Sequence, residues 1–98
     1  MIHALTLFPS TLGQEELDNI LSKTITGFKG AEGLRSFKIS EGHIMSPGGP
    51  PPYSKVIELS FESLELFMAW VESPAAQSMG SLFTSSGIVR LFYEVKEL

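Results

Sequence analysis

The chain has 98 residues, with 7 Lys+Arg against 11 Asp+Glu for a formal net charge of −4, and it has no cysteine. A chain of this length has room for one small domain, so we expect a single domain over residues 1–98. The acidic balance argues against a nucleic-acid partner, which requires a basic face, and the lack of cysteine excludes disulfides and Cys-ligated zinc.

Hydropathy argues against a membrane protein. No apolar run approaches the roughly 18 residues of a transmembrane helix, and no basic segment precedes an apolar region at the N-terminus. We therefore expect a cytoplasmic protein with no membrane partner. Charged residues make up only 18% of the chain, below the roughly 25% of average globular proteins, which favours an oligomer.

The first half of the chain predicts a strand, a helix and a second strand. Residues 1–8 are apolar and end at Pro9 and Ser10, which is typical of a strand. Thr11 and Gln14 have the spacing of a capping box, and apolar residues at helical spacing then predict a helix that ends around residues 26–27. Residues 34–40 alternate polar and apolar, which predicts the second strand.

The second half begins with the longest loop, residues 42–52, which is rich in glycine and proline. Loops of this length in a compact domain are often functional. Residues 55–61 alternate again and predict a third strand, and residues 63–72 have the spacing of an amphipathic helix. Ser73 and Pro74 suit the start of a further helix that ends near residue 83, and residues 88–95 predict the last strand.

This order predicts an α+β, ferredoxin-like βαββαβ fold, with a four-stranded antiparallel sheet and its helices on one face. The first strand is largely apolar on both sides, and its period of two leaves open which face carries His3. A sheet that is apolar on both faces needs cover on both. Helices cover one face, and a second copy of the sheet is the simplest cover for the other, so we expect a homodimer.

Four short segments carry a family resemblance. They are, in order, Gly-Leu-Arg at residues 33–35, Gly-Gly-Pro-Pro-Pro-Tyr at 48–53, Glu-Leu-Ser-Phe-Glu-Ser at 58–63 and Ser-Pro-Ala-Ala-Gln at 73–77. Together they resemble the EthD-like family of dimeric α/β-barrel proteins over nearly the whole chain. The resemblance implies a ferredoxin-like protomer, a homodimer whose two sheets form a barrel, and a pocket between each sheet and its helices.

The resemblance also implies a range of functions. EthD-like proteins include an accessory protein of ether degradation and fungal dehydratases or decarboxylases, and the wider superfamily includes cofactor-free monooxygenases, cyclases and isomerases. These relatives imply a small apolar or aromatic oxygenated ligand and no cofactor. Family members commonly carry a histidine near the end of the first helix, where this chain has Thr24. The sequence therefore leaves open an acid/base enzyme and a non-catalytic binding or accessory protein.

Three residues are candidates for catalysis. His3 on the first strand and His43 beside the long loop are the side chains that titrate near neutral pH without a shift. Tyr53 closes the proline run, where its hydroxyl would orient a substrate oxygen. Each has a structural alternative: a solvated strand end for His3, a solvated loop position for His43 and an anchor of the loop for Tyr53.

Arg35, Trp70 and Phe83 are candidates for ligand binding. Arg35 would hold an anionic substrate, or would instead pair with Glu58 across the strands or across the dimer interface. Trp70 lies in an apolar helical stripe that is more often core than a binding site, and a third hypothesis is a purely structural dimer whose pocket is filled by Phe67, Trp70, Met79 and Phe83. The two histidines lie in different elements and lack metal-ligand spacing, so we expect no metal.

Overall fold

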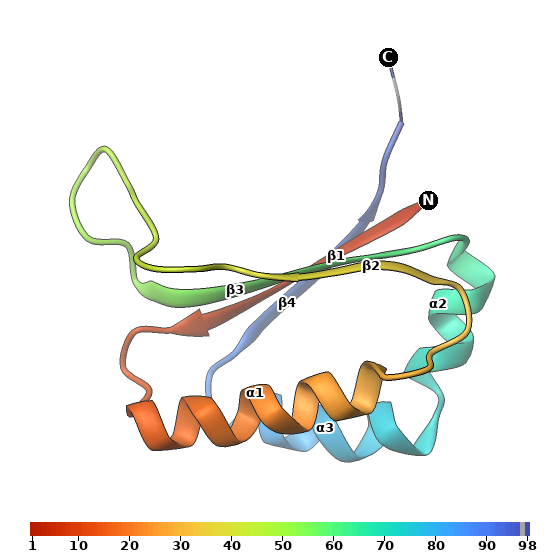
Figure 1. Cartoon of the computed structure of the whole chain (residues 1–98), viewed down its shortest axis with the longest axis horizontal. Helices are drawn as coiled ribbons and strands as arrows, with labels where there is room; N and C mark the ends of the chain where they lie inside the picture. Colours follow the sequence, from red (N-terminus) through yellow and green to blue (C-terminus); the bar gives the residue numbers. More distant parts are fainter. Residues whose placement is uncertain (97) are drawn as a thin grey trace.

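The structure, a computed structural model, describes residues 1–96 and 98 (Figure 1). Its four strands form one antiparallel sheet in the order β2-β3-β1-β4. In chain order the elements are β1 Ile2–Pro9, α1 Gln14–Phe28, β2 Leu34–Ile39, β3 Tyr53–Phe61, α2 Leu64–Val71, α3 Pro74–Ser85 and β4 Val89–Glu94. The predicted ferredoxin-like arrangement is confirmed, with its second helical segment divided into α2 and α3.

The start of α3 follows the predicted signals, and α2 begins with a serine cap of the same kind. The Ser63 hydroxyl accepts a hydrogen bond from the backbone N–H of Leu66 at 3.2 Å, and the Ser73 hydroxyl accepts one from that of Ala76 at 3.3 Å. Pro74 is the first helical residue of α3, where its missing N–H costs nothing. Because each helix has its own cap, the chain changes direction between them.

The start of α1 differs from the prediction. Gly13 is the N-cap residue and makes no side-chain cap, so the predicted capping box of Thr11 and Gln14 is wrong. With Gln14 as the first helical residue, neither side chain occupies a position from which it caps the helix. The Gln14 side chain instead donates a hydrogen bond to the carboxylate of Asp18 at 2.8 Å. The helix also extends to Phe28, slightly past the predicted end.

The two faces of the sheet have different surroundings. The helices α1 and α3 lie on one side of the sheet, with α2 beside one end (Figure 1). On β1, Ile2, Thr6 and Phe8 are buried, and the alternate residues between them, His3 included, are only half-buried. The side chains of His3, Leu5 and Leu7 therefore point to the face opposite the helices.

Within residues 1–96 and 98, no helix covers that opposite face, which we call the open face (Figure 1). The register pairs Leu5 with Leu91 and His3 with Tyr93, so these β4 side chains share the open face. Leu91 is 50% exposed and Tyr93 is 46% exposed. The open face is thus apolar along β1 and β4, as the sequence predicted.

The core lies between the other face of the sheet and the helices. Ile20 of α1 and Ile57 and Phe61 of β3 are fully buried there. The buried residues of α1 recur every three or four positions, which confirms the predicted apolar stripe; they are Leu17, Ile20, Thr24 and Phe28. Within residues 1–96 and 98, each helix is too short or too polar to span a bilayer.

Gly33 joins β2 to the region where β3 leads into α2. Its φ is +85°, and a Cβ atom there would lie 2.6 Å from the Cδ1 atom of Leu66. Its carbonyl oxygen accepts a hydrogen bond from the backbone N–H of Glu62 at 2.8 Å. Glycine is needed at this position for both the backbone conformation and the space.

We predict that two isoleucines of α1 differ sharply in their contribution to stability. Ile20 is fully buried and Ile25 is 46% exposed. Ile20→Ala should lower the free energy of unfolding by about 2–5 kcal/mol, because it removes buried methyl groups and leaves a cavity. Ile25→Ala should change it by about 0.5 kcal/mol or less. Urea denaturation measures both, and equal losses would contradict the packing of α1.

Candidate functional site

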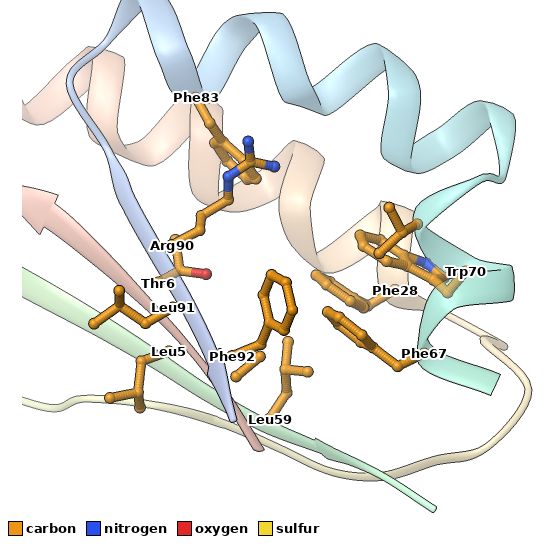
Figure 2. Close-up of a pocket in the computed structure, with 12 residues that line it drawn as sticks. Leu5, Thr6, Phe28, Leu59, Phe67, Trp70, Phe83, Arg90, Leu91 and Phe92 are labelled. Atoms are coloured by element: carbon orange, nitrogen blue, oxygen red, sulfur yellow. The ribbon is translucent and has the colours of Figure 1, made fainter. Parts of the chain in front are cut away.

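A cavity of about 250 Å³ lies between the helices and the strands β1 and β4 (Figure 2). An engineered protein cavity of about 150 Å³ binds benzene, whereas pockets for drug-sized ligands begin at roughly 300 Å³. The cavity therefore suits a molecule built on a single ring. It is lined by Ala4, Leu5, Thr6, Phe28, Leu59, Phe67, Trp70, Val71, Phe83, Arg90, Leu91 and Phe92.

Aromatic rings form much of the cavity wall. Trp70 of α2 stacks on Phe28 of α1, with ring centroids 4.0 Å apart and an interplanar angle of 12°. The Trp70 indole also donates a hydrogen bond to the backbone carbonyl of Gly27 at 3.3 Å. Phe67 lies 5.1 Å from Phe92 of β4, centroid to centroid. These contacts hold α2 against α1 and β4, so the aromatic wall of the cavity is formed without a ligand.

Two polar side chains stand among these apolar groups. Thr6 is 7% exposed, and the register places it directly opposite Arg90 on the adjacent strand. The Arg90 guanidinium carbon lies 5.1 Å from the ring centroid of Phe83, a cation–π contact. Figure 2 shows the Thr6 hydroxyl directed toward the cavity beside Arg90, while the Leu5 side chain points the other way.

The cavity opens toward solvent on the side of β4. Among the strands of residues 1–96 and 98, this one is at the edge of the sheet and pairs with β1 alone. Phe92 is 59% exposed although its ring borders the cavity, and Arg90 is also exposed. A molecule entering between β4 and the helices would therefore pass Arg90 and Phe92.

Of the ligand-binding residues predicted from the sequence, Trp70 and Phe83 line the cavity and Arg35 does not. The guanidinium of Arg35 lies 3.1 Å from the carboxylate of Glu62, and both side chains are more than half exposed. The predicted cross-strand pairing of Arg35 with Glu58 is wrong, whereas their pairing across a dimer interface stays a prediction. A register shift between Leu34 and Ser36 leaves Arg35 without a cross-strand partner, and Lys38 lies opposite Glu58 instead.

The three catalytic candidates lie apart from the cavity lining. His3 is on the open face, where its ring lies 6.1 Å from that of Tyr93. His43 is an exposed residue of the long loop, which projects from the end of the sheet away from α2 (Figure 1). Tyr53 begins β3 at that same end, opposite Pro9. Their catalytic roles stay predictions.

Thr24 occupies the position at which the family resemblance implies a histidine. It is fully buried, and its hydroxyl donates a hydrogen bond to the backbone carbonyl of Ile20 at 2.8 Å. Thr24 therefore acts as a core residue of α1. Among residues 1–96 and 98, no group of three or more His, Asp or Glu side chains is arranged to hold a metal ion.

Thr6 and Arg90 were missed as candidates by the sequence analysis. Both belong to alternating strands in which each looks like an ordinary polar position, and only the pairing of β1 with β4 brings them together. Phe28 was not singled out by the sequence analysis, and Phe67 was expected to fill the pocket in a structural dimer; both rings pack in the core and border the cavity as well. The sequence did offer one signal for Arg90, a charged residue between the apolar Ile88 and Phe92 on one face of the last strand.

No family model matches the sequence, and no curated protein matches it. Solved structures do match over nearly the full length. An EthD family protein from Bacillus halodurans has 17% identity and a TM-score of 0.77, covering 98% of this chain and 99% of that one. Hydroxynitrile lyase from Passiflora edulis has 21% identity and a TM-score of 0.78, covering 99% and 94%.

A dimeric ferredoxin-like protein from Jannaschia has 19% identity and a TM-score of 0.74, covering 96% of this chain and 98% of that one. At such identities the similarity shows the fold. The chain therefore has the ferredoxin-like fold of an EthD family protein and of a dimeric ferredoxin-like protein, as its sequence resemblance implied.

We predict that Trp70→Phe lowers the free energy of unfolding by about 1 kcal/mol, the net value of one hydrogen bond. The variant keeps an aromatic ring that stacks on Phe28, but it lacks the indole N–H that donates to the Gly27 carbonyl. Urea denaturation followed by circular dichroism measures the change. Trp70→Leu, which also removes the aromatic stack, should cost more than Trp70→Phe. Equal losses in the two variants would contradict a stabilising role for the stack.

Proposed function

We propose that each protomer is one EthD-like domain of residues 1–98, and that two protomers form a cytoplasmic homodimer. Each protomer binds a small apolar or aromatic oxygenated metabolite in the cavity beneath β4. The observation that carries this proposal is an aromatic-walled cavity of about 250 Å³ that contains two polar groups, Thr6 and Arg90. Ligand sites typically combine mostly apolar walls with a few polar groups that orient the ligand.

The packing supports a ligand site over a purely structural dimer. Phe67, Trp70 and Phe83, which would fill the pocket in a structural dimer, instead line a cavity that they leave open. Apolar walls that stay in contact with water cost stability, because removing apolar surface from water is favourable. A ligand that enters between these walls displaces water from them and stabilises the protein.

We predict that single-ring aromatic alcohols, ketones and acids stabilise the protein. At a ligand concentration of 100 times Kd, the free energy of unfolding should rise by about 2.7 kcal/mol. Trp70 is the only tryptophan of the chain and lines the cavity, so its fluorescence should change on binding. A thermal-shift screen followed by fluorescence titration of the positive compounds makes the measurement.

Two alanine-to-leucine variants control this experiment. Ala4 borders the cavity from β1, so Ala4→Leu should fill the space and abolish the stabilisation. Ala69 is exposed on α2, and Ala69→Leu should bind as the unmodified protein does. If Ala4→Leu folds and still binds the same compounds with unchanged affinity, the cavity is not their site.

The open face supports the homodimer. Leu91 and Tyr93 are about half exposed there, beside the apolar residues of β1. A contiguous apolar patch of this kind is typical of an interaction surface. The protein from Jannaschia, which has the same fold, is described as dimeric. A second copy placed sheet to sheet would cover both open faces at once.

We predict that Leu91→Glu yields a monomer. A carboxylate in the centre of an apolar interface would lose its hydration without gaining a partner. Ile25→Glu introduces the same charge at a residue of similar exposure, 46% against 50%, on the outer side of α1, and it should remain a dimer. Sedimentation velocity at micromolar concentration distinguishes the two. A monomeric unmodified protein would refute the homodimer.

A second candidate function is turnover of the bound molecule. It is favoured by the fold shared with a hydroxynitrile lyase over 99% of this chain. Because His3 and His43 lie apart from the cavity lining, turnover by either requires the molecule to reach it outside the cavity. In that case His3→Ala or His43→Ala should abolish product formation while binding to the cavity persists. Mass spectrometry of the bound compound after incubation tests for product. Stabilisation by a ligand that is recovered unchanged supports the binding function.

A further inference from the structure

We propose that the cavity selects a small aromatic or apolar carboxylate, whose carboxylate group binds to Arg90 with the Thr6 hydroxyl beside it. This inference rests on the proposed binding function and specifies its ligand. The cavity lining contains one charged side chain, Arg90, in a protein whose formal net charge is −4. Among the described residues, the fixed charge in the cavity lining is therefore positive.

The position of Arg90 suits an anion at the cavity mouth. Its side chain lies against the ring of Phe83, which restricts the guanidinium to one side of the opening. Within residues 1–96 and 98, no carboxylate lies within ion-pair distance of Arg90, whereas Arg35 is paired with Glu62. The Arg90 guanidinium thus keeps its hydrogen-bond donors available for a ligand.

The Thr6 hydroxyl supplies a second donor. Thr6 is 7% exposed and lies directly opposite Arg90 in the β1–β4 register. Figure 2 shows its hydroxyl directed toward the cavity. A hydroxyl in this position can donate a hydrogen bond to a ligand oxygen that arrives there.

The chemistry of the two groups favours a carboxylate. A guanidinium presents parallel N–H groups that match the two oxygens of a carboxylate, and such charge-assisted hydrogen bonds are stronger than neutral ones. The remaining walls, including Phe28, Phe67 and Phe92, suit a flat apolar body. An acid with one ring would thus place its ring among the phenylalanines and its carboxylate at Arg90, near solvent, where the desolvation cost is small.

Benzoate and its neutral analogue benzamide test this inference. Both have one ring and nearly the same shape, but only benzoate is charged at neutral pH. Two-dimensional NMR titration of the full chain measures weak affinities and shows which backbone amides respond. The unmodified protein should bind benzoate about tenfold or more tightly than benzamide, with shifts at Thr6 and Phe92, because hydrogen bonds to charged groups are the stronger ones.

Matched variants separate a specific contact from the net charge. Arg90→Gln should weaken benzoate binding about tenfold or more and change benzamide binding less than twofold. Lys23→Gln removes the same charge from the exposed side of α1 and should leave both affinities unchanged. Arg90→Lys keeps the charge without the planar fork and should lie between the unmodified protein and Arg90→Gln. It also serves as the test if Arg90→Gln does not fold.

The outcomes distinguish this inference from the function on which it rests. Equal affinity for benzoate and benzamide, or an equal loss of both in Arg90→Gln, would overturn the carboxylate preference and leave the small-molecule site standing. Unchanged benzoate binding in both Arg90 variants would also overturn it. If neither probe binds at millimolar concentration and no compound stabilises the protein, the proposed function itself fails.

Discussion

The register of β1 in the sheet is the constraint on which the rest of the structure depends. Its side chains alternate between the two faces, so one register choice decides that Thr6 faces the helices and His3 the open face. A slip of one residue would exchange them and would bring a histidine toward the cavity. The same choice places Leu5 and Leu7 on the open face. The chemistry of the cavity and the apolarity of the outer surface therefore have one common cause.

The aromatic contacts explain why a space persists inside so small a protein. Phe28 and Trp70 stack at 4.0 Å, and the indole hydrogen bond to Gly27 fixes their relative position. Rings held in this way cannot turn to fill a neighbouring gap, and the residues that border the gap from β1 and α2 include the small Ala4 and Val71. The cavity forms where large rigid rings lie beside small side chains, because neither fills the space between them.

Hydrophobic periodicity, capping residues and prolines predicted the fold because these signals are local. The strands, the cap at Ser73 and the two-sided apolarity of β1 all follow from short stretches of sequence. The site depends on pairing between distant strands. Thr6 and Arg90 lie opposite each other through the β1–β4 register. The cross-strand partner of Arg35 was predicted wrongly because alternation does not reveal a register shift in β2. Trp70 and Phe83 could be predicted as lining residues because their helical stripes point to the sheet.

The edge strand β4 connects the cavity to the open face. Arg90 and Phe92 lie on its helix side, while Leu91 and Tyr93 lie on its open side. Because β4 pairs with β1 alone, it has fewer hydrogen-bond partners to fix its position than a central strand has. A second copy packed on the open face would restrain β4 and with it the side chains at the cavity mouth. Dimerisation and ligand binding would then stabilise the same strand from opposite sides, so each would favour the other.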